Sequence, residues 1–368
     1  MIVAASSGAT VERVSVSAFK IPTDEPESDG TLEWDSTTLV VVQLESEGVN
    51  GIGYTYADAA TGKLIEEKLA PLVRNADPMQ TERVWSTMVA SIRNLGRPGI
   101  ASMAISAVDN ALWDLKARLL DMPLYRLLGA VRDRVPVYGS GGFTSYTIEQ
   151  LQRQLAAWVD AGIPRVKMKI GRHPLDDIER VAAARAAVGD ETELFVDANG
   201  AYRAKEALAF AGRFVESGVT WYEEPVYHRD LAGLRFVRDH APVEMEVSAG
   251  EYGYDPIDFS HLIEGCCVDV LQADVTRCEG ITGFSIVDSM CVAKNLPLST
   301  HCAPALSAHP AAAAKRLRHI EYFHDHVRIE QMLFDGFPPL VDGAFDLTHS
   351  GPGNGLTFKR HDAERFSL

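Results

Sequence analysis

Three acidic side chains are spaced so that each follows a strand-like run. Asp197 ends the run ELFVD, Glu223 ends VTWYE, and Glu251 follows in the next unit, at intervals of 26 and 28 residues. Carboxylates brought within a few ångströms of one another cannot all stay ionised unaided. A hard divalent cation resolves this, and an all-oxygen ligand set suits Mg²⁺, with Mn²⁺ as the alternative. We therefore predict a metal site on these three acids, with coordination positions left for water or a substrate carboxylate.

Two lysines lie in the run RVKMKI, two positions apart. Residues two apart on a strand face the same way, so Lys167 and Lys169 point to the same side. A solvated edge strand would have polar neighbours, whereas Val166, Met168 and Ile170 are apolar. A buried lysine beside another lysine and a metal ion has a lowered pKa, which suits a general base.

An aspartate and a histidine follow the next two strand-like runs. If Asp274 accepts a hydrogen bond from one imidazole nitrogen of His301, the other nitrogen is left for proton transfer. Glu321 lies in HIEYF, which we expect to be the last strand. Two interpretations of Glu321 stay open: a protonated acid that hydrogen-bonds a substrate carboxylate, or a buried structural partner.

The elements that position these residues repeat. From Val135 onward the chain alternates helix, glycine and strand, which predicts parallel strands with crossover helices. The strand-end polar residues recur every 20–28 residues, as in a TIM-type barrel. A doubly wound sheet would not gather them around one point, because its strands lie in a row. The seven residues are Lys169, Asp197, Glu223, Glu251, Asp274, His301 and Glu321.

The first part of the chain follows a different pattern. Residues 10–56 alternate apolar and polar positions, as in a strand meander, and residues 62–128 have helical periodicity. We therefore predict an α+β capping domain over 1–132 and a barrel over 133–333. The glycine- and proline-rich tail, 334–368, departs from the repeat and is expected to return to the capping domain.

Substrate specificity is expected to come from the capping domain. The acidic Thr23–Trp34 segment should be a mobile loop, and together with Tyr54–Tyr56 it should cover the barrel mouth. We expect Trp34, Tyr54 and Tyr56 to contact substrate. Asn199, two residues after Asp197, is a further candidate through its side-chain hydrogen bonds.

Composition limits the partners and the compartment. The chain has 368 residues and a formal net charge of −16, which argues against binding nucleic acid or an anionic membrane surface. Its five cysteines are confined to the last third, so a disulfide framework is not expected and a reducing compartment is. No apolar run approaches the ~20 residues of a membrane span, and the N-terminus lacks the pattern of a secretory signal. We expect a cytoplasmic protein acting on a small molecule.

Several short runs together resemble the mandelate racemase subgroup of the enolase superfamily, and the resemblance covers almost the whole chain. It implies an N-terminal capping domain over a (β/α)7β barrel, and symmetric homo-oligomers. It implies Mg²⁺ on the three acids, with Lys169 and the His301–Asp274 dyad on opposite faces of the substrate. Lys167 would lie near the substrate carboxylate and depress the pKa of Lys169, and Glu321 matches an acid that polarises that carboxylate. The runs are KMK at 167–169, VDANG at 196–200, YEEP at 222–225, AGE at 249–251, QAD at 272–274 with GIT at 280–282, and THCAP at 300–304, together with YTYADA at 54–59 and SAVDNALWDLKARLLDMPLYRLLGA at 106–130.

The resemblance implies abstraction of the proton α to a carboxylate, with an enediolate stabilised by Mg²⁺, Lys167 and Glu321. Dehydration of a sugar acid is the favoured outcome, because it is the commonest one for this lysine-plus-His/Asp arrangement in the family. Racemisation or epimerisation of a 2-hydroxy acid and cycloisomerisation of a sugar-acid lactone are the alternatives. A catalytically silent binding barrel is the non-enzymatic alternative, which the loss of an acid or base would have favoured.

Overall fold

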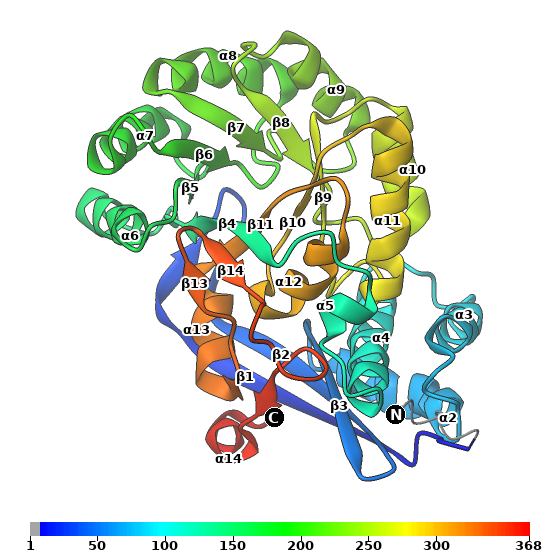
Figure 1. Ribbon diagram of the computed structural model, residues 1–368. Coiled ribbons are helices and arrows are strands. Elements are labelled where there is room, and N and C mark those ends of the chain that lie inside the picture. The colour runs from blue at the N-terminus through cyan, green and yellow to red at the C-terminus, as the bar shows by residue number, and fades with distance from the viewer. Residues whose placement is uncertain (1–7) are drawn as a thin grey trace.

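The computed structural model describes residues 8–368 and contains a closed barrel with a smaller α+β unit against it (Figure 1). Residues 1–7 lie outside the described residues. They form the start of the predicted capping domain and of the N-terminal stretch that lacks the pattern of a secretory signal. Among the described residues, no helix is long and apolar enough to cross a membrane.

The barrel has eight parallel strands, and it closes because the last strand pairs with the first, Ile320 opposite Val137. Seven helices connect them, which confirms the predicted (β/α)7β architecture. The strands are β4 (Arg134–Gly141), β5 (Arg165–Lys169), β6 (Glu193–Asp197), β7 (Val219–Glu223), β8 (Glu246–Ala249), β9 (Val270–Ala273), β10 (Leu298–Thr300) and β11 (Leu317–Phe323). The helices are α6 (Ile148–Asp160), α7 (Pro174–Val188), α8 (Ala204–Phe214), α9 (Leu231–His240), α10 (Pro256–Glu264), α11 (Gly280–Lys294) and α12 (Pro304–Ala313).

Local signals fix where the barrel helices start and stop. Thr147 caps α6 in a capping box: the Gln150 backbone N–H donates to Thr147 Oγ1 at 3.2 Å, and the Thr147 N–H donates to Gln150 Oε1 at 2.9 Å. Gly162 and Gly189 follow α6 and α7 with φ of 85° and 73°, a backbone region that favours glycine. Each glycine therefore turns the chain into the next strand.

Inside the barrel, large aromatic rings form a floor. Phe195 stacks on Trp221 with ring centroids 5.2 Å apart, and Tyr138 meets Phe195 edge-on at 5.7 Å. All three rings are fully buried. The Lys167 ammonium lies 5.1 Å from the Tyr138 ring centroid. Interior layers of this kind make a barrel a packed core, so its chemistry is confined to the mouth.

The capping unit is an antiparallel sheet of β1 (Arg13–Ser28), β2 (Glu33–Ser46) and β3 (Val49–Tyr56), as the alternating pattern predicts. Its helices are α1 (Ala60–Leu64), a π-helical turn (Ile65–Leu69), α2 (Ala70–Val73), α3 (Thr81–Ser91), α4 (Ile100–Leu119) and α5 (Leu124–Leu127). Helix α4 connects the two units: Asn110 Nδ2 donates to Val275 O, and Thr282 N donates to Asp109 Oδ2, both in the segment that follows β9.

Helix α4 also packs directly on glycines of β3. A Cβ added at Gly53 would lie 2.3 Å from Ala107 O and 2.4 Å from Ala111 N, both backbone atoms of α4. We expect Gly53→Ala to destabilise the protein by about 1–3 kcal/mol, because the helix backbone must move away. Gly212→Ala in α8, where a Cβ meets nothing within 4 Å, is the matched control and should stabilise by up to ~1 kcal/mol. Urea unfolding midpoints check both; an unchanged midpoint for Gly53→Ala contradicts the packing argument.

The prediction of a mobile loop over Thr23–Trp34 is wrong. Strand β1 continues to Ser28, and Glu27 pairs with Trp34 of β2 beyond a register shift that begins after Pro22. The segment is fastened to the barrel: the Thr144 N–H donates to Ser28 O at 2.8 Å, and Arg172 pairs with Glu33 at 2.6 Å. Glu33 and Asp24 pair with residues more than a hundred positions away, Arg172 and His324. Glu27 and Asp29 have local partners: Glu27 accepts from Trp34 Nε1, and Asp29 accepts from the Thr31 and Leu32 N–H groups.

The tail contacts both units. It contains β12 (Phe334–Asp335), β13 (Leu340–Val341), β14 (Ala344–Asp346), β15 (Thr357–Phe358) and α14 (Arg360–Ala363), and it follows α13 (His324–Leu333). Strand β14 pairs antiparallel with β4 of the barrel, whereas Ser367 bridges to Phe19 of β1. We propose the division 1–132, 133–333 and 334–368, with the tail completing the capping unit after its contact with β4.

Candidate active site

The three acids lie together at the carboxyl end of the barrel. Asp197 and Glu223 are the last residues of β6 and β7, Glu251 comes two residues after β8, and one oxygen from each lies within 4.8 Å of the others. All three are buried, and Glu251 Oε2 has no hydrogen-bond partner within residues 8–368. Buried oxygens in this arrangement fit a hard divalent cation, because burying an ionised carboxylate without a partner is costly.

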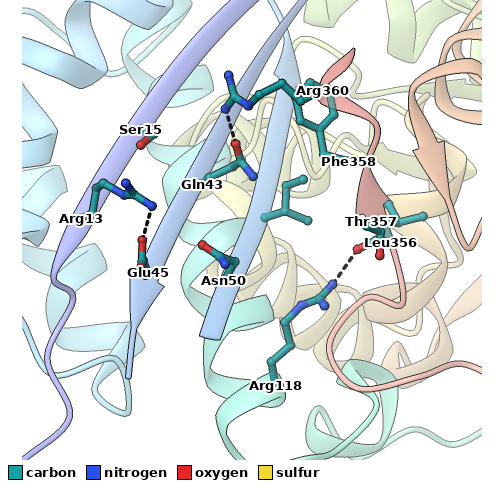
Figure 2. A pocket seen from close by; sticks show the side chains of 11 residues that line it. Arg13, Ser15, Gln43, Glu45, Asn50, Arg118, Leu356, Thr357, Phe358 and Arg360 are labelled. Carbon is teal, nitrogen blue, oxygen red and sulfur yellow. Dashed lines mark hydrogen bonds and ion pairs between the residues drawn. The ribbon is translucent and has the colours of Figure 1, made fainter. Parts of the chain in front are cut away.

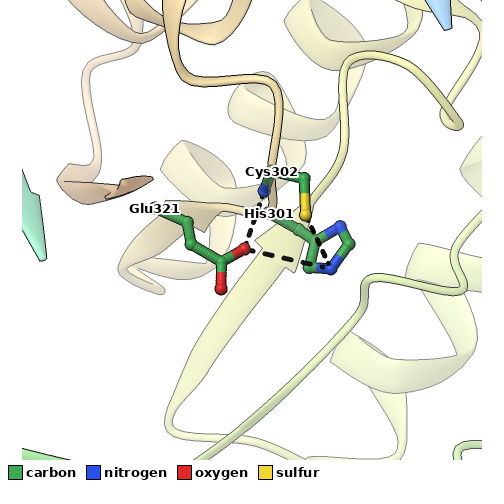
Figure 3. A group of neighbouring side chains, drawn as sticks. All are labelled: His301, Cys302 and Glu321. Atoms are coloured by element: carbon green, nitrogen blue, oxygen red, sulfur yellow. Dashed lines mark hydrogen bonds and ion pairs between the residues drawn. The ribbon is translucent and has the colours of Figure 1, made fainter. Parts of the chain in front are cut away.

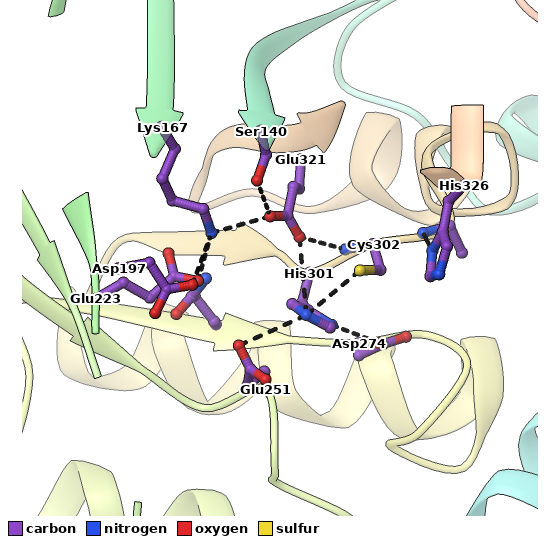
Figure 4. Close-up of polar contacts among 12 residues, drawn as sticks. Ser140, Lys167, Asp197, Glu223, Glu251, Asp274, His301, Cys302, Glu321 and His326 are labelled. Carbon is purple, nitrogen blue, oxygen red and sulfur yellow. Dashed lines mark hydrogen bonds and ion pairs between the residues drawn. The ribbon is translucent and has the colours of Figure 1, made fainter. Parts of the chain in front are cut away.

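Both lysines contact this cluster, and Figure 4 shows Lys167 pointing into it. Lys169 Nζ lies 2.5 Å from Asp197 Oδ2, and Lys167 Nζ contacts Glu223 and lies 2.9 Å from Glu321 Oε1. Burial lowers the pKa of Lys169, but Asp197 outweighs it and the net shift is upward. The protein groups alone therefore raise the pKa of Lys169. The sequence-based expectation was a lowered pKa, and it included a metal ion beside the lysine.

The histidine and aspartate form a hydrogen-bonded pair. His301 Nδ1 donates to Asp274 Oδ2 at 2.7 Å, because an ionised carboxylate only accepts. The Thr276 N–H and Oγ1 both donate to the other Asp274 oxygen at 2.7 Å. Burial alone would raise the pKa of Asp274, but His301 and Arg277 bring it below its usual value. This ionised aspartate fixes the ring and turns His301 Nε2 away from it.

Glu321 lies in the middle of β11, two residues before the strand ends, and not at the end as expected. Its Oε1 accepts from Ser140 Oγ at 2.6 Å, and its Oε2 accepts from the Cys302 N–H at 2.7 Å. Burial would raise the pKa of Glu321, but Lys167 and His301 hold it well below its usual value. The geometry favours an ionised partner of Lys167 over a protonated acid.

A cavity of about 430 Å³ opens between the barrel mouth and the capping sheet. Lys169, Glu251 and His301 line it, and so do the candidate substrate residues Trp34, Tyr56 and Asn199. Lys167, Asp274 and Glu321 lie behind these groups. Tyr54 does not line the cavity: its hydroxyl donates to Glu330 Oε1 at 2.7 Å, and its ring stacks on Phe334.

Several lining residues were not singled out from the sequence. Arg277 lies 3.4 Å from Asp274 and 3.6 Å from Glu251, and its place three residues after a strand-end aspartate was an available signal. His326 is buried in the first turn of α13, and its ring stacks on that of Tyr56 with centroids 3.4 Å apart. The remaining lining residues of this kind are Asp29, Leu32, Ser36, Thr37, Thr38, Ala57, Asp58, Tyr252, Cys302 and Phe323.

A second cavity, of about 490 Å³, lies between the polar face of the capping sheet and the tail (Figure 2). Its three arginines are already engaged: Arg13 with Glu45, Arg118 with Leu356 O at 2.7 Å, and Arg360 with Gln43 at 2.5 Å. It contains none of the acids or bases described above, so the chemistry belongs at the barrel mouth.

Two family models match the chain. The model described as Enolase C-terminal domain-like matches residues 150–363, and the one described as Mandelate racemase / muconate lactonizing enzyme, N-terminal domain matches residues 16–129. The chain belongs to the mandelate racemase/muconate lactonizing enzyme family of the enolase superfamily. This confirms the resemblance found in the sequence.

Three members of this family illustrate its range. A mandelate racemase/muconate lactonizing enzyme-like protein from Rubrobacter xylanophilus is 52% identical, with a TM-score of 0.96 over 98% of this chain and 100% of that one. The 3,6-anhydro-alpha-L-galactonate cycloisomerase of Streptomyces coelicolor is 32% identical, over 84% of this chain and 88% of the relative. A variant of L-talarate/galactarate dehydratase from Salmonella typhimurium LT2, solved with Mg and L-glucarate, is 27% identical, with a TM-score of 0.90 over 98% and 93% of the two chains.

Proposed function

We propose that this protein is a Mg²⁺-dependent enzyme that abstracts the proton α to a carboxylate and dehydrates a sugar acid. The observation that carries the proposal is one cavity lined by Lys169 and by His301, beside three buried acids that fit a divalent cation. Relatives that are sugar-acid dehydratases, an anhydrogalactonate cycloisomerase and a galactarolactone cycloisomerase support the same chemistry. Asp197, Glu223 and Glu251 are the proposed ligands, with Mn²⁺ as an alternative ion.

The residues divide the proton transfers between them. When bound, the divalent cation stabilises negative charge that develops on the substrate carboxylate. Lys169 exchanges a proton with the α-carbon, and His301 Nε2 delivers a proton to the leaving β-hydroxyl. Asp274 holds the imidazole in place through Nδ1. Lys167 adds positive charge beside the carboxylate of Glu223, and Glu321 in turn positions Lys167.

The same groups could complete a cycloisomerisation or a racemisation, because each begins with the same proton abstraction. Because two relatives are cycloisomerases, cycloisomerisation is the second candidate reaction. A catalytically silent barrel gains no support, since every proposed acid, base and ligand is present.

The charges around the cavity favour a substrate with a single carboxylate. The guanidinium of Arg277 is engaged by Asp274 and Glu251, and the Lys169 ammonium is engaged by Asp197. Burial, with the nearby His301, lowers the pKa of His326 to about 3, so this ring is neutral. Asp29 and Asp58 face the same space, beside hydroxyl side chains suited to a polyol. Among the described residues that line this cavity, a second carboxylate would meet acids and no free cation.

We therefore expect aldonates to be dehydrated in preference to aldarates of the same configuration. A screen of matched pairs such as gluconate and glucarate, with Mg²⁺ and a colour reaction for the 2-keto-3-deoxy product, measures this. The expected preference in kcat/KM is at least tenfold, about 1.4 kcal/mol. Asp58→Asn should reduce the preference for aldonates, because it removes one negative charge from the cavity. The asparagine can still accept the hydrogen bond from Ala60 N, because asparagine and aspartate cap helices equally well. A preference for aldarates contradicts the charge argument, and no turnover of any acid sugar contradicts the proposed reaction.

We also propose a homo-oligomer in a reducing compartment, the cytoplasm. All five cysteines are free thiols, which supports the compartment. The family's symmetric assemblies support the oligomer, and light scattering at several protein concentrations tests it. The net charge of −16 supports the absence of nucleic-acid partners.

A further inference from the structure

Beside the three-acid cluster lies a second group of potential metal ligands with different chemistry. His301, Cys302 and Glu321 each offer one ligand atom, and the three atoms lie within 4.8 Å of one another (Figure 3). Cys302 Sγ is 3.3 Å from His301 Nε2, which is 3.9 Å from Glu321 Oε2. The group therefore combines one sulfur, one nitrogen and one oxygen, whereas the neighbouring cluster offers oxygen alone.

This donor set suits a thiophilic ion. Cysteine sulfur and imidazole nitrogen are ligands of Zn²⁺, whereas Mg²⁺ prefers oxygen. Tetrahedral bonds of about 2.3 Å to sulfur and about 2.0 Å to nitrogen place these two ligand atoms roughly 3.5 Å apart. The observed 3.3 Å is close to that separation, and the oxygen needs to approach the nitrogen by only a few tenths of an ångström.

The surroundings already orient these ligands. His301 Nδ1 donates to Asp274 at 2.7 Å, which leaves Nε2 facing Cys302 and Glu321 and, at 3.5 Å, Glu251 Oε2 of the all-oxygen cluster. Carboxylate–histidine pairs of this kind fix the ring and raise its basicity toward a metal ion. Ser140 and Lys167 hold the other oxygen of Glu321. His301 and Cys302 both line the cavity, so an ion can reach them from the mouth.

We propose that a thiophilic divalent cation of the Zn²⁺ class binds to His301 Nε2, Cys302 Sγ and Glu321 Oε2, at a site separate from that of Mg²⁺. On binding, the Cys302 thiol loses its proton to solvent, and water completes the coordination. The ion occupies the lone pair of Nε2, the atom to which we assign proton transfer, so it reversibly blocks the enzyme. The binding itself does not depend on which reaction the enzyme catalyses.

The test uses Co²⁺ as a spectroscopic probe on the full chain with saturating Mg²⁺, so that the all-oxygen site is filled. We expect one equivalent of Co²⁺ to produce a thiolate-to-metal charge-transfer band, which Zn²⁺ then removes. Cys302→Ser should abolish the band. Cys267→Ser should keep it, because Cys267 is buried elsewhere, where its thiol donates to Leu231 O.

Two results overturn the site: no charge-transfer band in the wild-type protein, or a band that survives in Cys302→Ser. X-ray absorption at the zinc edge of the wild-type protein decides the question even if Cys302→Ser does not fold. One sulfur at about 2.3 Å is expected, and a shell of oxygen and nitrogen alone contradicts the proposal. Where a substrate is available, Zn²⁺ should inhibit the wild-type enzyme at least tenfold more strongly than Cys302→Ser.

Discussion

Replacing either Lys169 or His301 with alanine is expected to lower kcat by about 10²–10⁴-fold, the usual contribution of a positioned acid or base. Both side chains line the cavity, and each offers a nitrogen toward it from a different strand end, β5 and β10. Substrate affinity should change far less, because proton transfer matters in the transition state and not in the ground state. Steady-state kinetics with the preferred acid sugar measure both quantities.

Isotope exchange separates the two roles. If Lys169 takes the α-proton, His301→Ala should still incorporate deuterium from solvent at the α-carbon of recovered substrate, whereas Lys169→Ala should not. Lys205→Ala and His240→Ala are matched controls, since both residues are exposed on barrel helices, and they should retain full activity. Full activity in Lys169→Ala and in His301→Ala would show that the catalytic pair is assigned wrongly.

The barrel and the grouping of its acids could be predicted because both follow from one repeat. Polar residues that end consecutive parallel strands converge on one rim, so the spacing of Asp197, Glu223 and Glu251 was enough to bring them together. The position of Glu321 was harder. The run HIEYF predicts a strand but does not show which of its residues lies at the rim, and the pairing of Glu321 with Tyr138 places Glu321 within β11.

What sequence reasoning missed depends on contacts between distant segments. Tyr54 and Tyr56 are two residues apart on β3, yet Tyr56 reaches the cavity and Tyr54 is held back by Glu330, which lies 276 residues later. His326 is buried because α13 packs it against Tyr56. No local pattern near residues 54 or 326 specifies these pairings. The charge of the mouth, and with it the substrate class, depends on the same distant contacts.

Removing the metal is expected to abolish turnover and to lower thermal stability. Chelation with EDTA followed by added Mg²⁺ should restore both. A ligand that binds only the folded state stabilises it by about 2.7 kcal/mol at a concentration of 100 times Kd. Glu251→Gln is the informative variant, because Glu251 Oε2 has no hydrogen-bond partner in the described chain. Its ion pairs with Arg277 and His301, at 3.6 and 3.5 Å, are longer than the lysine pairs of Asp197 and Glu223.

Glutamine keeps the size of the Glu251 side chain but removes its charge. We expect the Mg²⁺ affinity to fall by more than ~100-fold. Loss of a residue that only supports a metal ligand lowers the affinity by up to about 100-fold, and loss of the charge of a direct ligand should lower it further. The melting temperature of Glu251→Gln should then no longer respond to Mg²⁺ at concentrations that stabilise the wild-type protein. Glu244→Gln, an exposed glutamate before β8, is the control and should behave as wild type. If Glu251→Gln binds Mg²⁺ normally by calorimetry, the cation is held elsewhere. The proton-transfer roles of Lys169 and His301 would then need another source of charge stabilisation.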